Sequence, residues 1–171
     1  MDILVIVLRL FHIFGGVFWA GGAFMLVGYI EPTVRGLGPE GGRFMQKFAG
    51  QSGFSQAMGI AAMSNMIAGI LLYWLDSGGL RPEWIMTGTG LTFTVGAIAA
   101  FISSGFGFGG NARVAGEMTA LGKQIASAGA PPTPSQMAQM QAFQEKLRQG
   151  GMRVSVFMII ALIAMATARY I

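Results

Sequence analysis

The chain has 171 residues, of which 53% are hydrophobic and only 11% are charged, whereas about 25% of the residues of a soluble domain are charged. It contains no cysteine, which excludes disulfides, iron–sulfur clusters and thiolate metal sites. In a soluble protein the net charge of +4 would indicate nucleic-acid binding. In a chain this apolar it reflects membrane topology, and we predict no nucleic-acid partner.

Four long segments without charged residues predict four membrane-spanning helices. A helix needs about 20 apolar residues to cross the hydrocarbon core, and three of the uncharged segments are that long. The fourth is shorter, but Arg153 and Arg169 at its ends can extend their side chains to the interfaces. We therefore predict an all-α integral membrane protein: a four-transmembrane-helix bundle that is a single domain over residues 1–171. Its expected helices are approximately residues 3–30, 54–75, 84–128 and 135–171.

The basic residues predict the orientation of this bundle. Eight of the 11 lysines and arginines lie in residues 31–53 and 110–153, two connections that fall on the same side of a four-helix chain. Cytoplasmic connections carry the excess of basic residues. The chain is thus expected to cross the bacterial cytoplasmic membrane four times, with both termini outside, and its first partner is the lipid bilayer.

The third and fourth predicted helices are too long for the membrane alone. Pro131, Pro132 and Pro134 separate them, and Ser135 offers an N-cap for the last helix. The sequence therefore predicts a cytoplasmic helical hairpin that extends helices three and four, with a kink at Gly150–Gly151. This hairpin packs on itself, on a second subunit or on a different partner. The first predicted helix is shorter than these two and is expected to end at Glu31-Pro32.

Small residues at four-residue spacing predict how the helices meet. Lipid supplies no hydrophobic force for association, so packing depends on close backbone approach. Such ridges occur on every predicted helix: Gly16 and Ala20, with Gly15 four residues before Trp19; Ala57, Ala61, Asn65 and Gly69; Thr92, Gly96, Ala100 and Ser104; and, at spacings of three and four residues, Ala161, Ala164 and Ala168. The amide of Asn65 is expected to donate a hydrogen bond across helices.

The only histidine, His12, lies in the first apolar segment. An ionisable residue inside a membrane helix indicates a functional site. Arg9 and Trp19 share its helix face at i−3 and i+7, and Gly16 leaves that face flat. This surface suits a porphyrin, with His12 ligating the iron and Arg9 neutralising a propionate.

Depth in the membrane suggests a sixth ligand for that iron. His12 lies about nine residues, or roughly 13 Å, from the outer end of its helix. The same depth on the other helices corresponds to Met66 and Met165, although five-coordinate iron or a second His12 from a twin chain is equally allowed. Three other roles for His12 stay open: a structural hydrogen bond, a quinone or proton site, and a copper site that includes methionines. The spacing of Met63 and Met66 is typical of metal ligands, and thioethers suit Cu(I), but core filling is the stronger interpretation of these methionines.

The first helix resembles that of a diffuse group of bacterial membrane proteins through the pattern His12-x-x-Gly15-Gly16-x-x-Trp19-Ala20-Gly21-Gly22. The group includes the copper-resistance protein D family, related small four-helix proteins of unknown function, and the haem-binding membrane protoporphyrinogen oxidases. Length, helix count and the closing residues 164–170 resemble the small four-helix branch most. The oxidase branch implies a haem on the residue that matches His12, and electron transfer coupled to porphyrin oxidation.

Two functional classes follow from these patterns. The first is a small membrane protein that binds haem b for electron transfer, with His12 as its metal ligand. The other residues of this predicted site are Arg9, Gly16, Trp19, Met66 and Met165. The second class is a non-catalytic membrane subunit of a homo-oligomer or larger complex, in which His12 is structural. Copper handling is a further alternative. No catalytic residue is assigned; an enzymatic role would be that of an oxidoreductase of the protoporphyrinogen-oxidase type.

Overall fold

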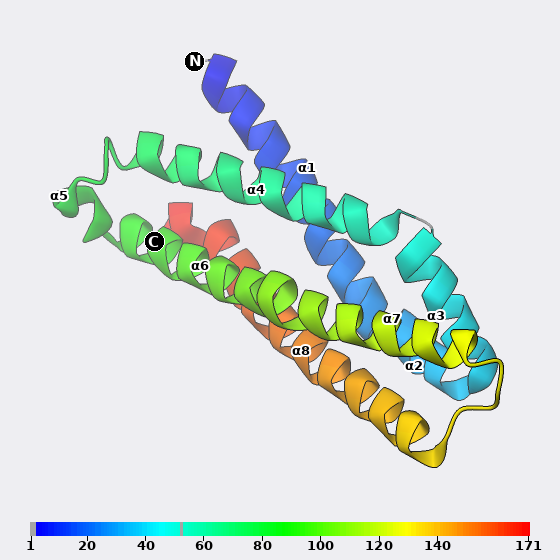
Figure 1. Cartoon of the computed structure of the whole chain (residues 1–171). Coiled ribbons are helices and arrows are strands. Elements are labelled where there is room, and N and C mark those ends of the chain that lie inside the picture. Colours follow the sequence, from blue (N-terminus) through cyan, green and yellow to red (C-terminus); the bar gives the residue numbers. More distant parts are fainter. Residues whose placement is uncertain (1–2, 52) are drawn as a thin grey trace.

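The structure, a computed structural model, describes residues 3–51 and 53–171, and these form helices joined by short connections, with no strand among them (Figure 1). Four helical segments are long and apolar enough to cross a membrane: Ile3–Gly36, Phe54–Asp76, Gly88–Ser127 and Pro134–Tyr170. The predicted all-α chain with four potential membrane spans is therefore confirmed. The elements of these spans are α1 (Ile3–Met25), η1 (Leu26–Ile30), α2 (Glu31–Gly36), α4 (Phe54–Asp76), α6 (Gly88–Ser104), η2 (Gly105–Asn111), α7 (Ala112–Ser127), α8 (Pro134–Thr167) and η3 (Ala168–Tyr170). Two further helices connect the spans: α3 (Pro39–Gln51) and α5 (Pro82–Ile85).

The first span continues through Glu31-Pro32, where the sequence predicted its end. A proline inside an α-helix lacks an N–H group and clashes with the carbonyl four residues earlier, here that of Gly28. Gly28 lies in η1, a π-helix in which the N–H of Glu31 bonds to the carbonyl of Leu26 instead. This wider turn accommodates the proline, so the helix ends only at Gly36.

The third span begins at Gly88 rather than near Trp84. The N-cap of α6 is Thr87, whose backbone is extended and whose hydroxyl accepts a 3.0 Å hydrogen bond from the Gly90 N–H. Trp84 belongs to α5, a separate single turn. Beyond the membrane-length part of the span, η2 lets the helix run on into α7 without a break.

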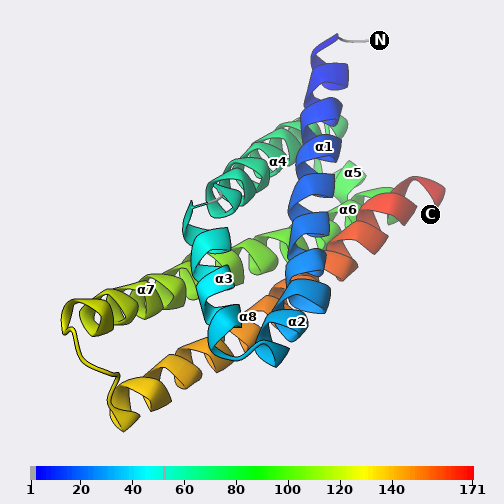
Figure 2. The same cartoon turned by 90° about the vertical axis from the view of Figure 1, so that its right-hand side faces the viewer.

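Helix α7 packs along α8 (Figures 1 and 2), and the assignment of this pair as a cytoplasmic hairpin stays a prediction. The N-cap of α8 is Thr133 and not Ser135, because Thr133 and Gln136 form a reciprocal capping box and Pro134 suits the first helical position. The helix is continuous through Gly150–Gly151, which are both buried. These two glycines allow close packing against Asn111 and Val27, and the kink predicted there stays a prediction.

The helices pack as two pairs, α1 on α4 and α6 on α8. Predicted small residues mediate both contacts: Gly15 faces the Ala61 carbonyl, and Gly96 faces Ala164. The pairs join through a buried cluster around Trp19, Ala62 and Met158. Towards the end of the molecule that holds α5 and both termini they diverge, as Figure 1 shows for α1. The divergence leaves a space between the pairs.

Candidate cofactor cavity

The space between the helix pairs is a cavity of about 890 Å³, within the range of roughly 300–1,000 Å³ typical of small-molecule sites. Its walls come from α1, α4, α6 and α8 and are almost entirely apolar. All six residues of the predicted site line this single cavity: Arg9, His12, Gly16, Trp19, Met66 and Met165. The structure thus brings these six residues together around one cavity.

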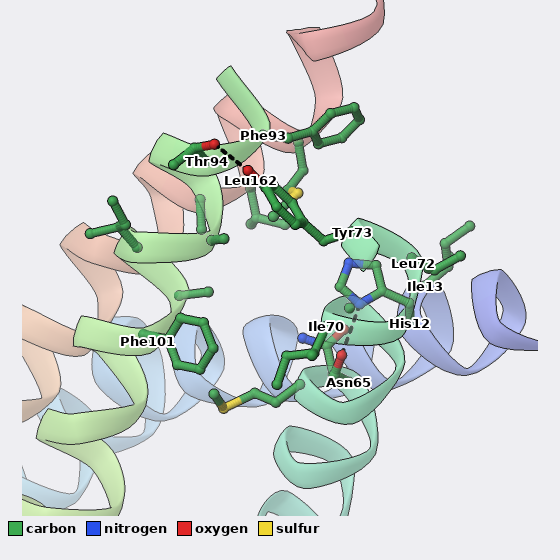
Figure 3. Close-up of a pocket in the computed structure, with 18 of the residues that line it drawn as sticks. His12, Ile13, Asn65, Ile70, Leu72, Tyr73, Phe93, Thr94, Phe101 and Leu162 are labelled. Carbon is green, nitrogen blue, oxygen red and sulfur yellow. Dashed lines mark hydrogen bonds between the residues drawn. The ribbon is translucent and has the colours of Figure 1, made fainter. Parts of the chain in front are cut away.

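The position of the His12 ring is fixed by α4. Its Nδ1 lies 2.9 Å from the backbone oxygen of Asn65. A carbonyl only accepts hydrogen bonds, so Nδ1 carries the hydrogen and the lone pair of the neutral ring is on Nε2. The ring also lies directly over Gly69, where a Cβ would be 2.8 Å from Cε1. Figure 3 shows Nε2 turned away from Asn65, towards the side on which Tyr73 and Thr94 lie.

Asn65 contributes a second polar group to the same wall. Its side chain is buried, and its Oδ1 has no hydrogen-bond partner among the described residues. A Cβ on Gly16 would lie 3.1 Å from this oxygen, so the glycine makes room for the amide. The hydrogen bond that joins α1 to α4 here runs from His12 to the Asn65 backbone carbonyl. A hydrogen bond donated across helices by the Asn65 side-chain amide stays a prediction.

Aromatic residues close one end of the cavity. The Tyr73 hydroxyl lies 2.6 Å from Thr94 Oγ1, which itself donates to the Gly90 carbonyl at 2.7 Å. Tyr73 is therefore the donor to Thr94, and the bond joins α4 to α6 (Figure 3). Trp84 contacts the Tyr73 ring edge-on and stacks on Phe93. Sequence reasoning missed this group, although Tyr73 continues the four-residue ridge of Asn65 and Gly69.

The charged residues of the cavity lie towards the end of the molecule that holds α5 and both termini, on three different helices. They are Arg9 on α1, Asp76 at the end of α4, and Arg169 in η3. Asp76 pairs with Arg169, at 4.0 Å, because α8 brings the C-terminal turn back beside the end of α4. The sequence contains a signal for Arg169 at this site, because Arg169 lies four residues, or about one helical turn, after Met165.

The two methionines of the predicted site lie in different surroundings. Met66 belongs to the same helix pair as His12, and its sulfur lies 3.0 Å from the Ser104 hydroxyl. Met165 belongs to the other pair and packs against Gly96. Met63, which was considered with Met66 as a copper site, is 51% exposed on the outer surface and does not line the cavity. The spacing of Met63 and Met66 therefore does not bring them together on one site.

Comparison with protein-family models, with curated proteins and with solved structures finds no match to this chain. The resemblance to the copper-resistance protein D and protoporphyrinogen-oxidase group stays a prediction.

Proposed function

We propose that this protein binds haem b in the cavity between its helix pairs and serves as a small membrane electron-transfer protein. The observation that carries the proposal is the state of His12. A ring whose Nδ1 donates to a backbone carbonyl presents Nε2 as a basic ligand in a fixed orientation, the arrangement that metal-ligating histidines use. Haem, when bound, would supply the one-electron chemistry.

The rest of the cavity suits the same ligand. Apolar walls match the faces of a porphyrin, and guanidinium groups bind carboxylates well. Arg9 and Arg169 lie at one end of the cavity, where they would hold propionates. The chain's residues would hold the ligand between the pairs, Tyr73 and Trp84 would exclude water, and the Asn65 carbonyl would orient the His12 ring.

Met165 is the better candidate for a sixth ligand. A second ligand would come from the wall of the cavity that faces His12, which is held by the α1/α4 pair. Met165 comes from α8, on the far side of the cavity, whereas Met66 comes from α4 and contacts Ser104. We therefore favour Met165 over Met66.

We also propose the membrane orientation and the protein family that the sequence predicts. Both termini and α5 would lie outside the cytoplasmic membrane, and the α7–α8 hairpin would project into the cytoplasm. This orientation agrees with the positive-inside rule and puts the charged end of the cavity at the outer face. The small four-helix branch of the copper-resistance protein D and protoporphyrinogen-oxidase group is the proposed family.

An absorption spectrum of the protein purified in mild detergent tests the proposal, with haem supplied during expression. We expect a Soret band that sharpens and shifts on reduction by dithionite. His12→Ala should lose the band while keeping the helical circular dichroism, because it removes the ligand and leaves the packing around Gly69 uncrowded. Ser135→Ala, on the distant hairpin, is the control and should keep the band.

The alternative class predicts a different result. A colourless wild-type protein that purifies with stoichiometric partners, or as a defined homo-oligomer, would contradict haem binding. It would favour the non-catalytic membrane subunit, in which the bond from His12 to Asn65 only joins two helices.

A further inference from the structure

We infer that the charged rim of the cavity selects ligands with free carboxylates, and that Asp76 holds Arg169 until a ligand carboxylate replaces it. The rim consists of Arg9, Asp76 and Arg169. This inference rests on the proposed haem function and adds the chemistry by which the site would recognise its ligand and fix its orientation.

The first argument is charge balance. The rim residues are the only charged ones among the described residues that line the cavity, and they carry two positive charges and one negative. Arg9 has no ion-pair partner within the described part of the chain. Arg9 is half-buried at the edge of the cavity, and a guanidinium in this position can bind a ligand carboxylate.

The second argument is that the existing ion pair can be exchanged. Arg169 and Asp76 are 4.0 Å apart, and their side chains are 57% and 35% exposed. Such pairs contribute little to stability. A planar guanidinium binds a well-placed carboxylate through two parallel hydrogen bonds, which is a stronger arrangement. A ligand carboxylate can therefore displace Asp76 from Arg169 at little expense.

The third argument is register. Arg9 lies three residues outward from His12 on α1, or about 4.5 Å along the helix at 1.5 Å per residue. Arg169 lies four residues outward from Met165, or about 6 Å. The two cations thus lie about one turn further along their helices than the two residues that would hold the iron. Arg9 and Arg169 would therefore hold the two carboxylates of a porphyrin bound in the cavity.

Titration of the full-length apoprotein with haem and with haem dimethyl ester tests this inference, using the Soret change to obtain each dissociation constant. We expect haem to bind roughly fivefold more weakly to Arg9→Gln and to Arg169→Gln, and about as much more tightly to Asp76→Asn. The ester, which has no free carboxylate, should bind all of these variants like the wild type. Arg81→Gln is the matched control, because Arg81 is an outer basic residue that does not line the cavity.

Comparison of Asp76→Asn with Arg169→Gln distinguishes recognition of the ligand carboxylate from a purely structural role of the ion pair. Both Asp76→Asn and Arg169→Gln break the same pair, so a purely structural role would weaken binding in both, and with both ligands. Equal affinity for haem and its ester in the wild type, or parallel effects of these two substitutions, would overturn the inference while leaving haem binding intact. No Soret change with either ligand would overturn haem binding itself, and the inference with it.

Discussion

At the scale of single residues, the site depends on how closely His12 lies against α4. The ring bonds to the Asn65 carbonyl and covers Gly69, so it has little freedom to turn. A glycine in the interior of a helix lowers its stability relative to alanine, by about 1 kcal/mol in water. Its presence at position 69 is explained by the imidazole that lies on it.

Gly69→Ala should therefore displace His12. The added Cβ would lie 2.8 Å from Cε1 and 3.1 Å from Nδ1 of the ring, so the ring has to shift and its bond to Asn65 is strained or lost. We expect thermal stability in detergent to fall, with a cost of about 1–3 kcal/mol for the crowded contact exceeding the gain in helix propensity. We also expect the haem content per protein to fall.

Gly59→Ala on the same helix is the matched control, because no atom lies within 4 Å of a Cβ there. It should keep the haem content and keep or raise the melting temperature. If Gly69→Ala behaved like Gly59→Ala in both measurements, the fixed position of His12 would not matter to the site.

At the scale of the elements, the junction between α5 and α6 positions the aromatic end of the cavity. Gly90, in the first turn of α6, lies so close to the Trp84 carbonyl that no Cβ could fit, and a Cβ would also lie 2.9 Å from Ile85 Cα. Both contacts are to backbone, which cannot move aside as a flexible side chain can. The position of Trp84 against Tyr73 and Phe93 thus depends on this glycine.

Gly90→Ala should separate α5 from α6 and lower the stability of the protein. We expect a loss of about 1–3 kcal/mol, the range for an added methyl group in a packed site, seen as a lower melting temperature in detergent. Gly122→Ala on α7, where a Cβ meets no atom within 4 Å, should be neutral or stabilising. Equal melting temperatures for the two variants would show that α5 is not held against α6 as the structure has it.

The sequence was sufficient to predict elements whose signals are local and strong. Long uncharged segments identified the four spans, and small residues at four-residue spacing identified the contacts at Gly15 and Gly96. The six predicted site residues share one cavity because depth in the membrane and helix face together determine where a side chain lies in a bundle.

Features that depend on neighbouring helices could not be predicted in the same way. Pro32 indicated a helix end, but the π-helix before it accommodates the ring. Ser135 is as good a capping residue as Thr133. Thr133 is the N-cap of α8 because Pro134 suits the first helical position and Gln136 completes the capping box. The pairing of Asp76 with Arg169 requires knowing that η3 returns beside the end of α4. Each of these depends on a partner that local spacing does not specify.

At the scale of the whole molecule, the separation into two helix pairs creates the cavity. Each pair is closely packed through small residues, and the pairs meet in the cluster around Trp19 and Met158. Towards α5, the Tyr73–Thr94 bond ties α4 to α6. A bundle packed equally along its whole length would leave no space beside His12, so the divergence of α1 seen in Figures 1 and 2 is part of the site.

The side of the membrane that the rim faces follows from the topology, which single cysteines can test because the chain has none of its own. Glu83 in α5 and Ala130 at the hairpin tip are both exposed, and they lie at opposite ends of the molecule (Figure 1). In intact spheroplasts a membrane-impermeant maleimide should label Glu83→Cys but should label Ala130→Cys only after permeabilisation, as the positive-inside rule requires. The reverse pattern would contradict the proposed orientation and turn Arg9, Asp76 and Arg169 towards the cytoplasm. Ligand carboxylates, and the electron donor nearest to them, would then be on the inner face, so this labelling decides on which side of the membrane to search for that donor.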